Sequence, residues 1–552
     1  MHDVLRLNPS AIDYAIIAVY FVVVLGIGAV ARLSIKTDVD FFLSGRALPA
    51  WITGLAFIAA NLGALEILGQ AANGAQYGIA TVHFYWIGAV PAMVFLGLVM
   101  MPFYYGAKVR SVPEYLRLRF NEGTHAFNAA TFAVGTVLIA GVNLFALALV
   151  MHLMLGWSID AAILVAAGIV LVYITLGGLT SAIYNEVLQF FIILASLIPL
   201  TIVGLHSVGG VQGLRERVKS STLGDAGLHA WQGLGVGSHN SLGANWIGIV
   251  LGLGFVLSFG YWTTNFAEVQ RALSAKNMSA ARRTPLIGAY PKIFLPAIVV
   301  IPGLLALVSV PGLGGSNSDL AYNNAVPLLI GKYFPEGMLG IAVTGLLAAF
   351  MAGVAANVTA FNTVFTYDLW QSYVRKGRDS SYYLRVGRWA TMGGLLVSIG
   401  TAFIAKGYSN IMNYVQLLFS YFNAPLFATF IIGMFWRRST PRAGLAGLIA
   451  GTLGAFVTHE LYTMGHVHFG SAQSANFGGA IVAFVADAVV TIGVSLVTRP
   501  KPEHELKGLV WGLNRDETED DFVRGDDAWY RSPWLLGAGA LVLVVVLNIV
   551  FI

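Results

Sequence analysis

The chain has 552 residues, of which 57% are hydrophobic and only 11% are charged, and its formal net charge is +5. A soluble protein carries about twice that share of charged residues, so the composition indicates a membrane protein and excludes an ordinary soluble domain. The chain contains no cysteine, which excludes disulfides, thiolate metal sites and cysteine nucleophiles. The basic residues lie in short loops between apolar runs, and this is not the pattern of a nucleic-acid-binding surface.

Apolar runs recur along the whole chain, each near the roughly 20 residues that a helix needs to cross a bilayer. Backbone groups in lipid must satisfy one another, so these runs are predicted to be helices and the fold to be all-α. The first run is interpreted as a retained helix, because it is long and lacks a signal-peptide cleavage pattern. We predict about 14 transmembrane helices, at residues 13–33, 49–74, 77–105, 124–155, 158–178, 180–206, 243–273, 284–309, 337–370, 386–406, 408–436, 443–462, 476–498 and 533–551.

The loops between these spans differ in charge. One alternate set holds 25 of the 32 Lys and Arg residues, and the opposite set holds six. By the positive-inside rule the richer set is cytoplasmic, which predicts a multi-pass protein of the plasma (cell inner) membrane with both termini extracytoplasmic. Lys292 is the one Lys or Arg that falls within a predicted span away from its ends.

Two predicted spans, 49–74 and 243–273, combine glycines with polar side chains. The first contains Asn61, Gly63 and Glu66, and the second contains Ser258 and Asn265 among its glycines and threonines. Interrupted segments at matching places in two halves point to a midplane binding site between inverted repeats. Glycines also allow close helix packing in membranes, but the adjacent polar side chains favour a broken-helix site.

Several motifs resemble those of the sodium/solute symporters, most closely the sodium–glucose branch. They are FIAANLGALE at 57–66, SVPEYLRLRF at 111–120, YITLGGLTSA at 173–182 and YW at 261–262 followed by QRALSAKNMS at 270–279. DFFLSGR at 40–46 and FWR at 435–437 also match, so the resemblance covers about residues 40–440. It implies a LeuT-like core of ten helices in a five-plus-five inverted repeat, with one helix before the core and three after it.

The predicted domain organisation follows from that core. The parts are an N-terminal extra helix with a cytoplasmic loop (1–48), the first repeat (49–206), an extracellular loop (207–242), the second repeat (243–436) and peripheral C-terminal helices (437–552) that contain a charged cytoplasmic loop at 499–532.

The resemblance also implies a solute site, with sugar-contacting positions at Asn61, Tyr261, Trp262, Asn265, Lys292 and Gln416. The residues themselves agree in part, because a buried cation is costly in lipid and commonly functional, although a structural pair with a carboxylate would also explain Lys292. Amide side chains both donate to and accept from hydroxyls.

One departure from the sugar transporters concerns a family glutamate, whose position is Tyr85 in this chain. Glu66 is the candidate that compensates for it. Asn61 and Glu66 would lie about 140° apart on an unbroken helix. An unwound stretch at Leu62–Gly63 would bring both side chains to one cavity. The alternative is a glutamate bonded to another helix.

The family holds one sodium ion by backbone carbonyls and by two hydroxyls. The carbonyl positions correspond here to Ala59, Leu62 and Ala349, but the hydroxyl positions are Ala352 and Gly353. Three interpretations stay open: water completes a weak sodium site, Asn357 supplies an oxygen, or the coupling ion is a proton carried by Glu186. Sodium is favoured because the carbonyl positions remain.

Three other acidic residues in predicted spans are not assigned a functional role. Glu268 and Asp368 lie near the predicted cytoplasmic ends of their helices, where charge is ordinary, and Asp487 lies in a peripheral span where a structural partner is expected.

The sequence therefore predicts a transporter and not an enzyme. The leading hypothesis is sodium-coupled symport of a small polar solute, most simply a sugar, by alternating access. The alternatives are a proton- or sodium-coupled carrier of an organic acid or amino acid and, more remotely, a membrane solute sensor or a passive channel. We expect the solute, the coupling ion and the lipid bilayer as partners, with no organic cofactor and no nucleic acid.

Overall fold

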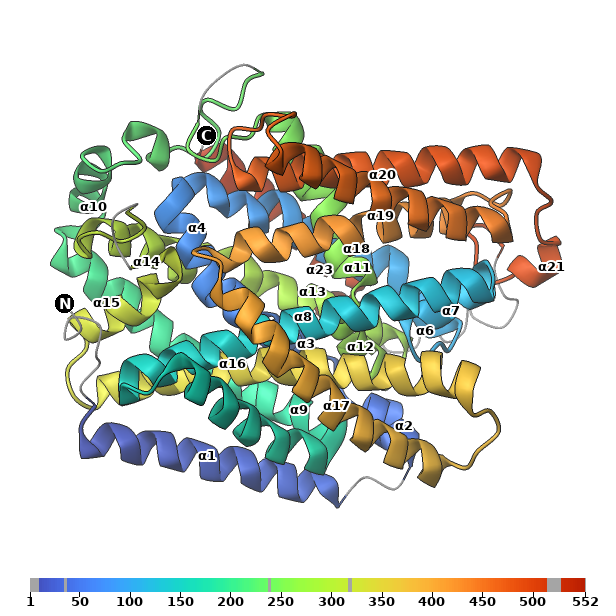
Figure 1. Cartoon of the computed structure of the whole chain (residues 1–552), viewed down its shortest axis with the longest axis horizontal. Coiled ribbons are helices and arrows are strands. Elements are labelled where there is room, and N and C mark those ends of the chain that lie inside the picture. Colours follow the sequence, from blue (N-terminus) through green and yellow to red (C-terminus); the bar gives the residue numbers. More distant parts are fainter. Residues whose placement is uncertain (1–8, 34–36, 237–239, 316–319, 514–527, 552) are drawn as a thin grey trace.

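The computed structural model describes residues 9–33, 37–236, 240–315, 320–513 and 528–551 (Figure 1). Within these ranges the chain forms helices and no β-strand, with one isolated bridge between Leu48 and Ala275. Part of the predicted loop 499–532, at 514–527, lies outside the described residues, as do the chain termini at 1–8 and 552.

The membrane-sized helices reproduce most of the predicted spans. Within the described residues, eleven single helices are long and apolar enough to cross a bilayer, and two further spans are each a bent pair of helices. The span predicted at 158–178 contains a shorter apolar helix, Ile159–Val172. It runs on into the next span inside one long element, with a break at Gly178 where φ is +52°. The predicted number of 14 is therefore not confirmed.

The main helices follow in chain order. They are α1 (Ala11–Arg32), α2 (Asp38–Leu43), α3 (Ala50–Asn61), η3 (Leu65–Gly69), α4 (Gln70–Tyr77), η5 (Phe84–Ala89), α5 (Val90–Phe95), η6 (Leu96–Met100), α6 (Met101–Gly106), α7 (Val112–Arg119), α8 (Glu122–Leu155), α9 (Ile159–Ser207), α10 (Gly210–Lys219), η8 (Gly248–Ser258), α11 (Phe259–Thr264), α12 (Phe266–Leu273), α13 (Met278–Phe294), α14 (Pro296–Ser309), α15 (Ala325–Tyr333), α16 (Met338–Thr363), η10 (Val364–Val374), α17 (Ser380–Lys406), α18 (Ile411–Phe435), α19 (Pro441–Thr463), α20 (Ala472–Val497), α21 (Glu503–Leu506) and α23 (Pro533–Val550).

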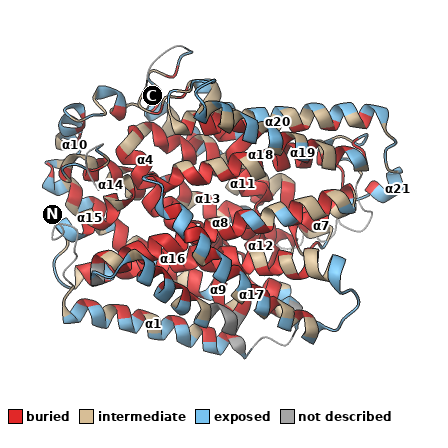
Figure 2. Ribbon diagram, in the orientation of Figure 1, coloured by how far each residue is buried: buried red, intermediate tan, exposed pale blue. Residues whose placement is uncertain are grey.

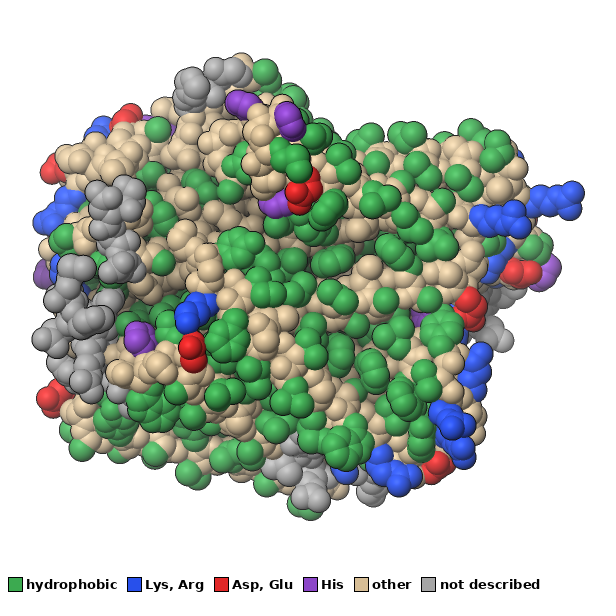
Figure 3. Space-filling model, in the orientation of Figure 1, with side chains coloured by type: hydrophobic (Ala, Val, Ile, Leu, Met, Phe, Trp, Pro, Cys, Tyr) green, Lys and Arg blue, Asp and Glu red, His purple; other side chains and the backbone are tan. Residues whose placement is uncertain are grey.

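The helices differ in how deeply they are buried. α16 is buried along nearly all its length and packs against α8 and α9, whereas α1, α17 and α20 expose one side (Figure 2). Apolar side chains cover the middle of the visible face, and Lys and Arg gather at the end near α7 and α21, called here the basic end (Figure 3). Both chain ends lie in the opposite half (Figure 1). An apolar girdle between polar ends is the surface that a bilayer covers.

Both predicted broken helices are present. α3 ends at Asn61, Leu62 leaves helical geometry with ψ of +35°, and the chain turns by 54° before continuing as η3. The second break lies at Asn265, whose ψ of +111° separates α11 from α12 with a 49° bend. Each break releases backbone groups from the helical pattern in the middle of the molecule.

The start of the first broken helix and the end of the second are joined by backbone hydrogen bonds. The Leu48 N–H, before α3, donates to the Ser274 carbonyl after α12 (3.2 Å), and the Lys276 N–H donates to the Leu48 carbonyl (2.9 Å). At the other end of the molecule Ser10 caps α1, and Asp13 accepts from the Ser10 N–H and also from the Gly337 and Gly340 N–H groups. These contacts connect the start of α3 to the end of α12, and the start of α1 to the start of α16.

Arg119 closes the bundle at the basic end. Its guanidinium is fully buried and donates to the carbonyls of Gly433, Trp436 and Ser439 where α18 ends. These carbonyls are among those that a helix end leaves without an internal partner.

We expect Arg119→Met to lower the free energy of unfolding by about 3 kcal/mol or more, because buried carbonyls lose charged donors. The thermal unfolding of the detergent-solubilised protein measures the effect. Arg117→Met is the matched control, since Arg117 is one-third exposed and holds a single ion pair with Glu114. Equal shifts for the two variants would contradict the assigned role of Arg119.

Candidate functional site

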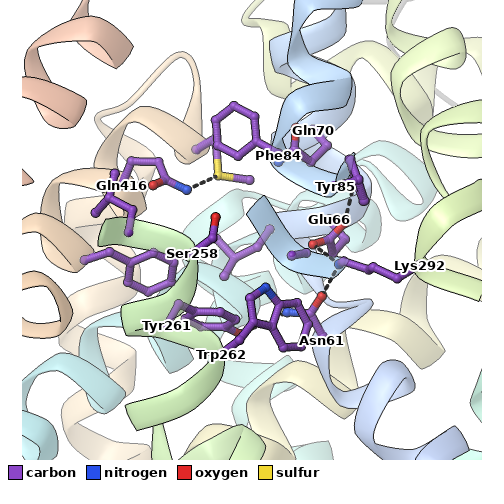
Figure 4. A pocket seen from close by; sticks show the side chains of 15 residues that line it. Asn61, Glu66, Gln70, Phe84, Tyr85, Ser258, Tyr261, Trp262, Lys292 and Gln416 are labelled. Carbon is purple, nitrogen blue, oxygen red and sulfur yellow. Dashed lines mark hydrogen bonds and ion pairs between the residues drawn. The ribbon is translucent and has the colours of Figure 1, made fainter. Parts of the chain in front are cut away.

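The two broken helices meet beside one central pocket. It is lined by the end of α3, η3 and α4 around the first break and by η8 and α11 before the second, with η5, α13 and α18 completing the wall (Figure 4). Seven of the eight predicted solute-site residues line it: Asn61, Glu66, Tyr85, Tyr261, Trp262, Lys292 and Gln416. The pocket encloses about 470 Å³, including solvent at its opening.

An ion pair forms one wall of the pocket. The Lys292 ammonium donates to Glu66 Oε1 at 2.5 Å and to Asn61 Oδ1, while the Tyr85 hydroxyl donates to Glu66 Oε2 at 2.5 Å. The ammonium also lies 5.0 Å from the ring centres of both Tyr85 and Trp262. The break at Leu62 thus directs Asn61 and Glu66 to the same cation. Glu66 is satisfied at both oxygens, and its charge is balanced.

Two amide side chains bring unused hydrogen-bonding capacity to the pocket. The Oε1 atoms of Gln70 and Gln416 have no hydrogen-bond partner among the described residues. Ser258 adds a hydroxyl on the side of Gln416, across the pocket from Lys292 (Figure 4). Buried polar atoms are normally satisfied, so these groups are suited to a ligand that donates hydrogen bonds.

Tyr261 and Trp262 form the aromatic part of the pocket. The Tyr261 ring packs against Phe419 with ring centres 4.6 Å apart, and its hydroxyl accepts from Asn61 Nδ2 at 2.9 Å. The same hydroxyl donates to Glu268 Oε1 at 2.6 Å, on the side toward α12. Tyr261 therefore lies between the pocket and a buried carboxylate.

Asn265 is the predicted solute-site residue that does not line this pocket. Its side chain caps α12 by accepting from the Ala267 N–H at 3.0 Å. It also borders a separate small cavity between α8 and α18, together with Phe419 and Asn423. The structure explains Asn265 through the bend that it stabilises.

The predicted cation positions lie where the break of the first repeat approaches α16. Ala59, Leu62, Ala349, Ala352 and Gly353 are all buried. A Cβ placed on Gly63 would lie 3.3 Å from the Gly353 Cα, so the two backbones are in direct contact. Neither Ala352 nor Gly353 has a hydroxyl to offer.

Asn143 of α8 fills the space that Gly353 leaves. Its Oδ1 lies 2.1 Å from the position of a Cβ at Gly353 and 2.4 Å from that at Gly63, so a side chain at either glycine would displace the Asn143 amide. The Ala64 N–H, just after the break, donates to this oxygen at 2.8 Å. An amide oxygen has two lone pairs, and this one lies at Gly63 and Ala64, directly after the break at Leu62.

The two predicted ion-pathway residues have other partners. Asn357 donates its amide to the Gly353 carbonyl at 2.8 Å, which is a contact within α16. Glu186 of α9 is fully buried and forms a two-point ion pair with Arg271 of α12, which includes an Nε–Oε2 contact of 3.2 Å. Glu186 therefore lies inside the bundle, with its charge balanced by Arg271.

Three residues of this region were not anticipated as functional. Gln70 follows Glu66 by four residues, and that spacing could have placed it on the same face. Asn143 is one of several polar residues in the long, mainly apolar helix α8, and no sequence spacing relates it to 59–62. Glu268 was set aside as a helix-end charge, but it is only 3% exposed because α12 lies inside the bundle.

A central pocket between two broken helices, with a balanced buried ion pair, is the arrangement of a secondary transporter built from repeats. The comparisons agree with this class. The model of the sodium:solute symporter family matches residues 41–451. The rat sodium/glucose cotransporter 2 is 28% identical over 95% of this chain and 84% of its own length. The Vibrio parahaemolyticus sodium/glucose cotransporter is 27% identical over 80% and 84%.

A solved structure shows the same fold. A Na⁺-coupled sialic acid symporter in a substrate-bound outward-open state superposes with a TM-score of 0.73 at 17% identity, over 89% of this chain and 99% of that one. This protein belongs to the sodium:solute symporter family. It is thus a multi-pass membrane transporter of the class that couples solute movement to sodium.

The Glu66–Lys292 pair makes a testable prediction about stability. We expect Lys292→Met to lower the free energy of unfolding by about 3–5 kcal/mol, because it leaves a buried carboxylate without its cation. The double variant Lys292→Met/Glu66→Gln should recover much of this loss. Thermal unfolding of Lys292→Met, of Glu66→Gln and of the double variant gives the coupling energy between the two side chains.

Lys406→Met is the control for this cycle, because the Lys406–Asp160 pair is exposed and contributes at most about 1 kcal/mol. If the double variant loses as much stability as the two single variants summed, the two side chains are not coupled in the folded protein.

Proposed function

We propose that the protein is a sodium-driven symporter of a neutral, polyhydroxylated solute, a sugar. The observation that carries this proposal is the charge balance of the pocket. Of its lining residues only Glu66 and Lys292 are charged, and they are paired with each other. A neutral solute enters such a site without disturbing the pair, whereas a carboxylate solute would have to displace Glu66 from Lys292.

The rest of the lining suits a sugar. Amide and hydroxyl groups of Gln70, Gln416 and Ser258 match ligand hydroxyls, which both donate and accept. The aromatic rings of Phe84, Tyr261, Trp262 and Phe419 offer flat apolar faces. The relatives described as sodium/glucose cotransporters support the same solute class.

We place the basic end in the cytoplasm of a plasma-membrane protein, with both chain ends outside, in accordance with the positive-inside rule. The repeats at 49–206 and 243–436 then form the transport core. The bends at Leu62–Gly63 and Asn265 are the hinges of alternating access. Solute and sodium act on one conformational equilibrium, to which each contributes its difference in affinity between the two states.

For the sodium site we propose the carbonyls of Ala59, Leu62 and Ala349 together with the amide oxygen of Asn143. Sodium is a hard cation that prefers oxygen ligands, and the unwound stretch exposes carbonyls. Asn143 replaces the oxygens that Ala352 and Gly353 lack, from a different helix.

The transport proposal is tested by uptake into proteoliposomes. Radiolabelled D-glucose, myo-inositol, lactate and alanine are compared, with and without an inward sodium gradient. We expect the neutral hydroxylated solutes to accumulate when the gradient is present. Preferential uptake of lactate or alanine, or sugar uptake that ignores sodium, would contradict the proposal.

The sodium ligand is tested by Asn143→Ala. The loss of one oxygen ligand should weaken the free energy of sodium binding by about 1.4 kcal/mol. The sodium concentration for half-maximal uptake should then rise about tenfold. Asn128→Ala, in the same helix but away from the break, should leave it unchanged. A second variant, Asn143→Ala/Gly353→Ser, should restore part of the affinity, because removal of the amide creates room for a hydroxyl. Unaltered sodium dependence in Asn143→Ala would remove Asn143 from the site.

A further inference from the structure

Glu268 is a buried acid that the pocket itself does not include. It is the third residue of α12, directly after the bend at Asn265, and is 3% exposed. Its Oε1 accepts from the Tyr261 hydroxyl at 2.6 Å. Its Oε2 is buried and has no hydrogen-bond partner among the described residues. An ionised carboxylate oxygen that is buried without a hydrogen-bond partner has a large unfavourable desolvation energy.

The surrounding charges do not balance Glu268. Arg271 and Lys292 are the cations that act on it, and each is already paired with another carboxylate, Glu186 and Glu66 respectively. The cluster thus contains two buried cations and three buried carboxylates. One negative charge is left over in the middle of a membrane protein.

The other elements packed against α12 supply no unpaired cation among the described residues. α3 and α16 contain no charged residue, and α11 presents Tyr261. On α13, Lys292 is paired with Glu66, the Arg282 guanidinium lies over the Trp534 ring, and Arg283 donates to the Ser279 carbonyl. The titratable side chains of α2 and α6 that the structure describes have partners of their own: Asp40 with Thr37, Tyr104 with Thr263 and Tyr105 with Ala275. The excess charge therefore remains on Glu268.

Glu268 is connected to the pocket by hydrogen bonds. Asn61 donates to the Tyr261 hydroxyl, which donates to Glu268, and Asn61 in turn accepts from Lys292. A negative carboxylate accepts strongly from Tyr261, whereas a protonated carboxyl accepts weakly. The charge on Glu268 thus affects the side chains that line the solute pocket.

We propose that Glu268 is a proton-binding site of the transport cycle, so that a proton moves with the solute in addition to sodium. The proton passes from water on one side to a carboxylate oxygen of Glu268, which cancels the excess charge, and it leaves to water on the other side. Glu186 is the poorer proton site, because Arg271 already neutralises it. The inference rests on the proposed transport function but not on the sodium ligands.

The test compares D-glucose uptake into proteoliposomes at fixed sodium, with and without an inward proton gradient. We expect the gradient to increase uptake several-fold in the wild-type protein and the ratio to fall to about one in Glu268→Gln, since the amide binds no proton. Asp487→Asn is the matched control, because Asp487 is a buried acid bonded to Thr429 and Thr491 in a peripheral span. It should keep the wild-type ratio.

A second measurement needs no solute. A carboxyl that is protonated when folded and ionised when unfolded loses its stabilising contribution as pH rises. As the pH rises above about 4.3, where an unfolded glutamate carboxyl ionises, the melting temperature of the wild type should therefore fall more steeply than that of Glu268→Gln.

The outcomes separate the two proposals. No glucose uptake under any gradient overturns the sugar assignment and leaves the melting slopes to decide the role of Glu268. A wild-type uptake ratio of one, an unchanged ratio in Glu268→Gln, or equal melting slopes overturns the proton site.

Discussion

Backbone hydrogen bonding within lipid is the constraint on which the rest of this structure depends. A helix that stops inside the bilayer leaves N–H and C=O groups without partners, so irregular backbone survives only where protein surrounds it. The breaks at Leu62–Gly63 and Asn265 are both enclosed in this way. Asn143 accepts from the Ala64 N–H beyond the first break, and Asn265 caps the helix after the second.

Charge balance is the second organising feature of the core. The protein buries Glu66, Lys292, Glu186, Arg271 and Glu268 close to the two breaks. Pairing makes four of these groups tolerable in a low-dielectric interior, and the fifth stands apart. The two breaks lie beside the solute pocket, the cation positions and the unmatched acid. A conformational change at the breaks would therefore alter all three.

Much of the architecture could be predicted from the sequence, because spans, loop charges and glycine-rich interruptions are local signals. The site was harder. The proximity of Asn61 and Glu66 depended on a break that glycine only suggested, and the partner of Lys292 depended on how η3 turns. Asn143 and Glu268 were missed because their roles come from helix packing. The amide of Asn143 matters through two glycines distant in sequence, and the short helix α12 buries a residue that looked close to water.

The backbone bridge at Leu48 has a mechanical consequence. Two hydrogen bonds join the start of α3 to the segment after α12, so the inner halves of both broken helices share one anchor. Separating them costs about 1 kcal/mol for each bond, whereas moving them together costs neither. The two bonds therefore favour joint movement of the start of α3 and the end of α12, and this link between the two broken helices does not include the solute.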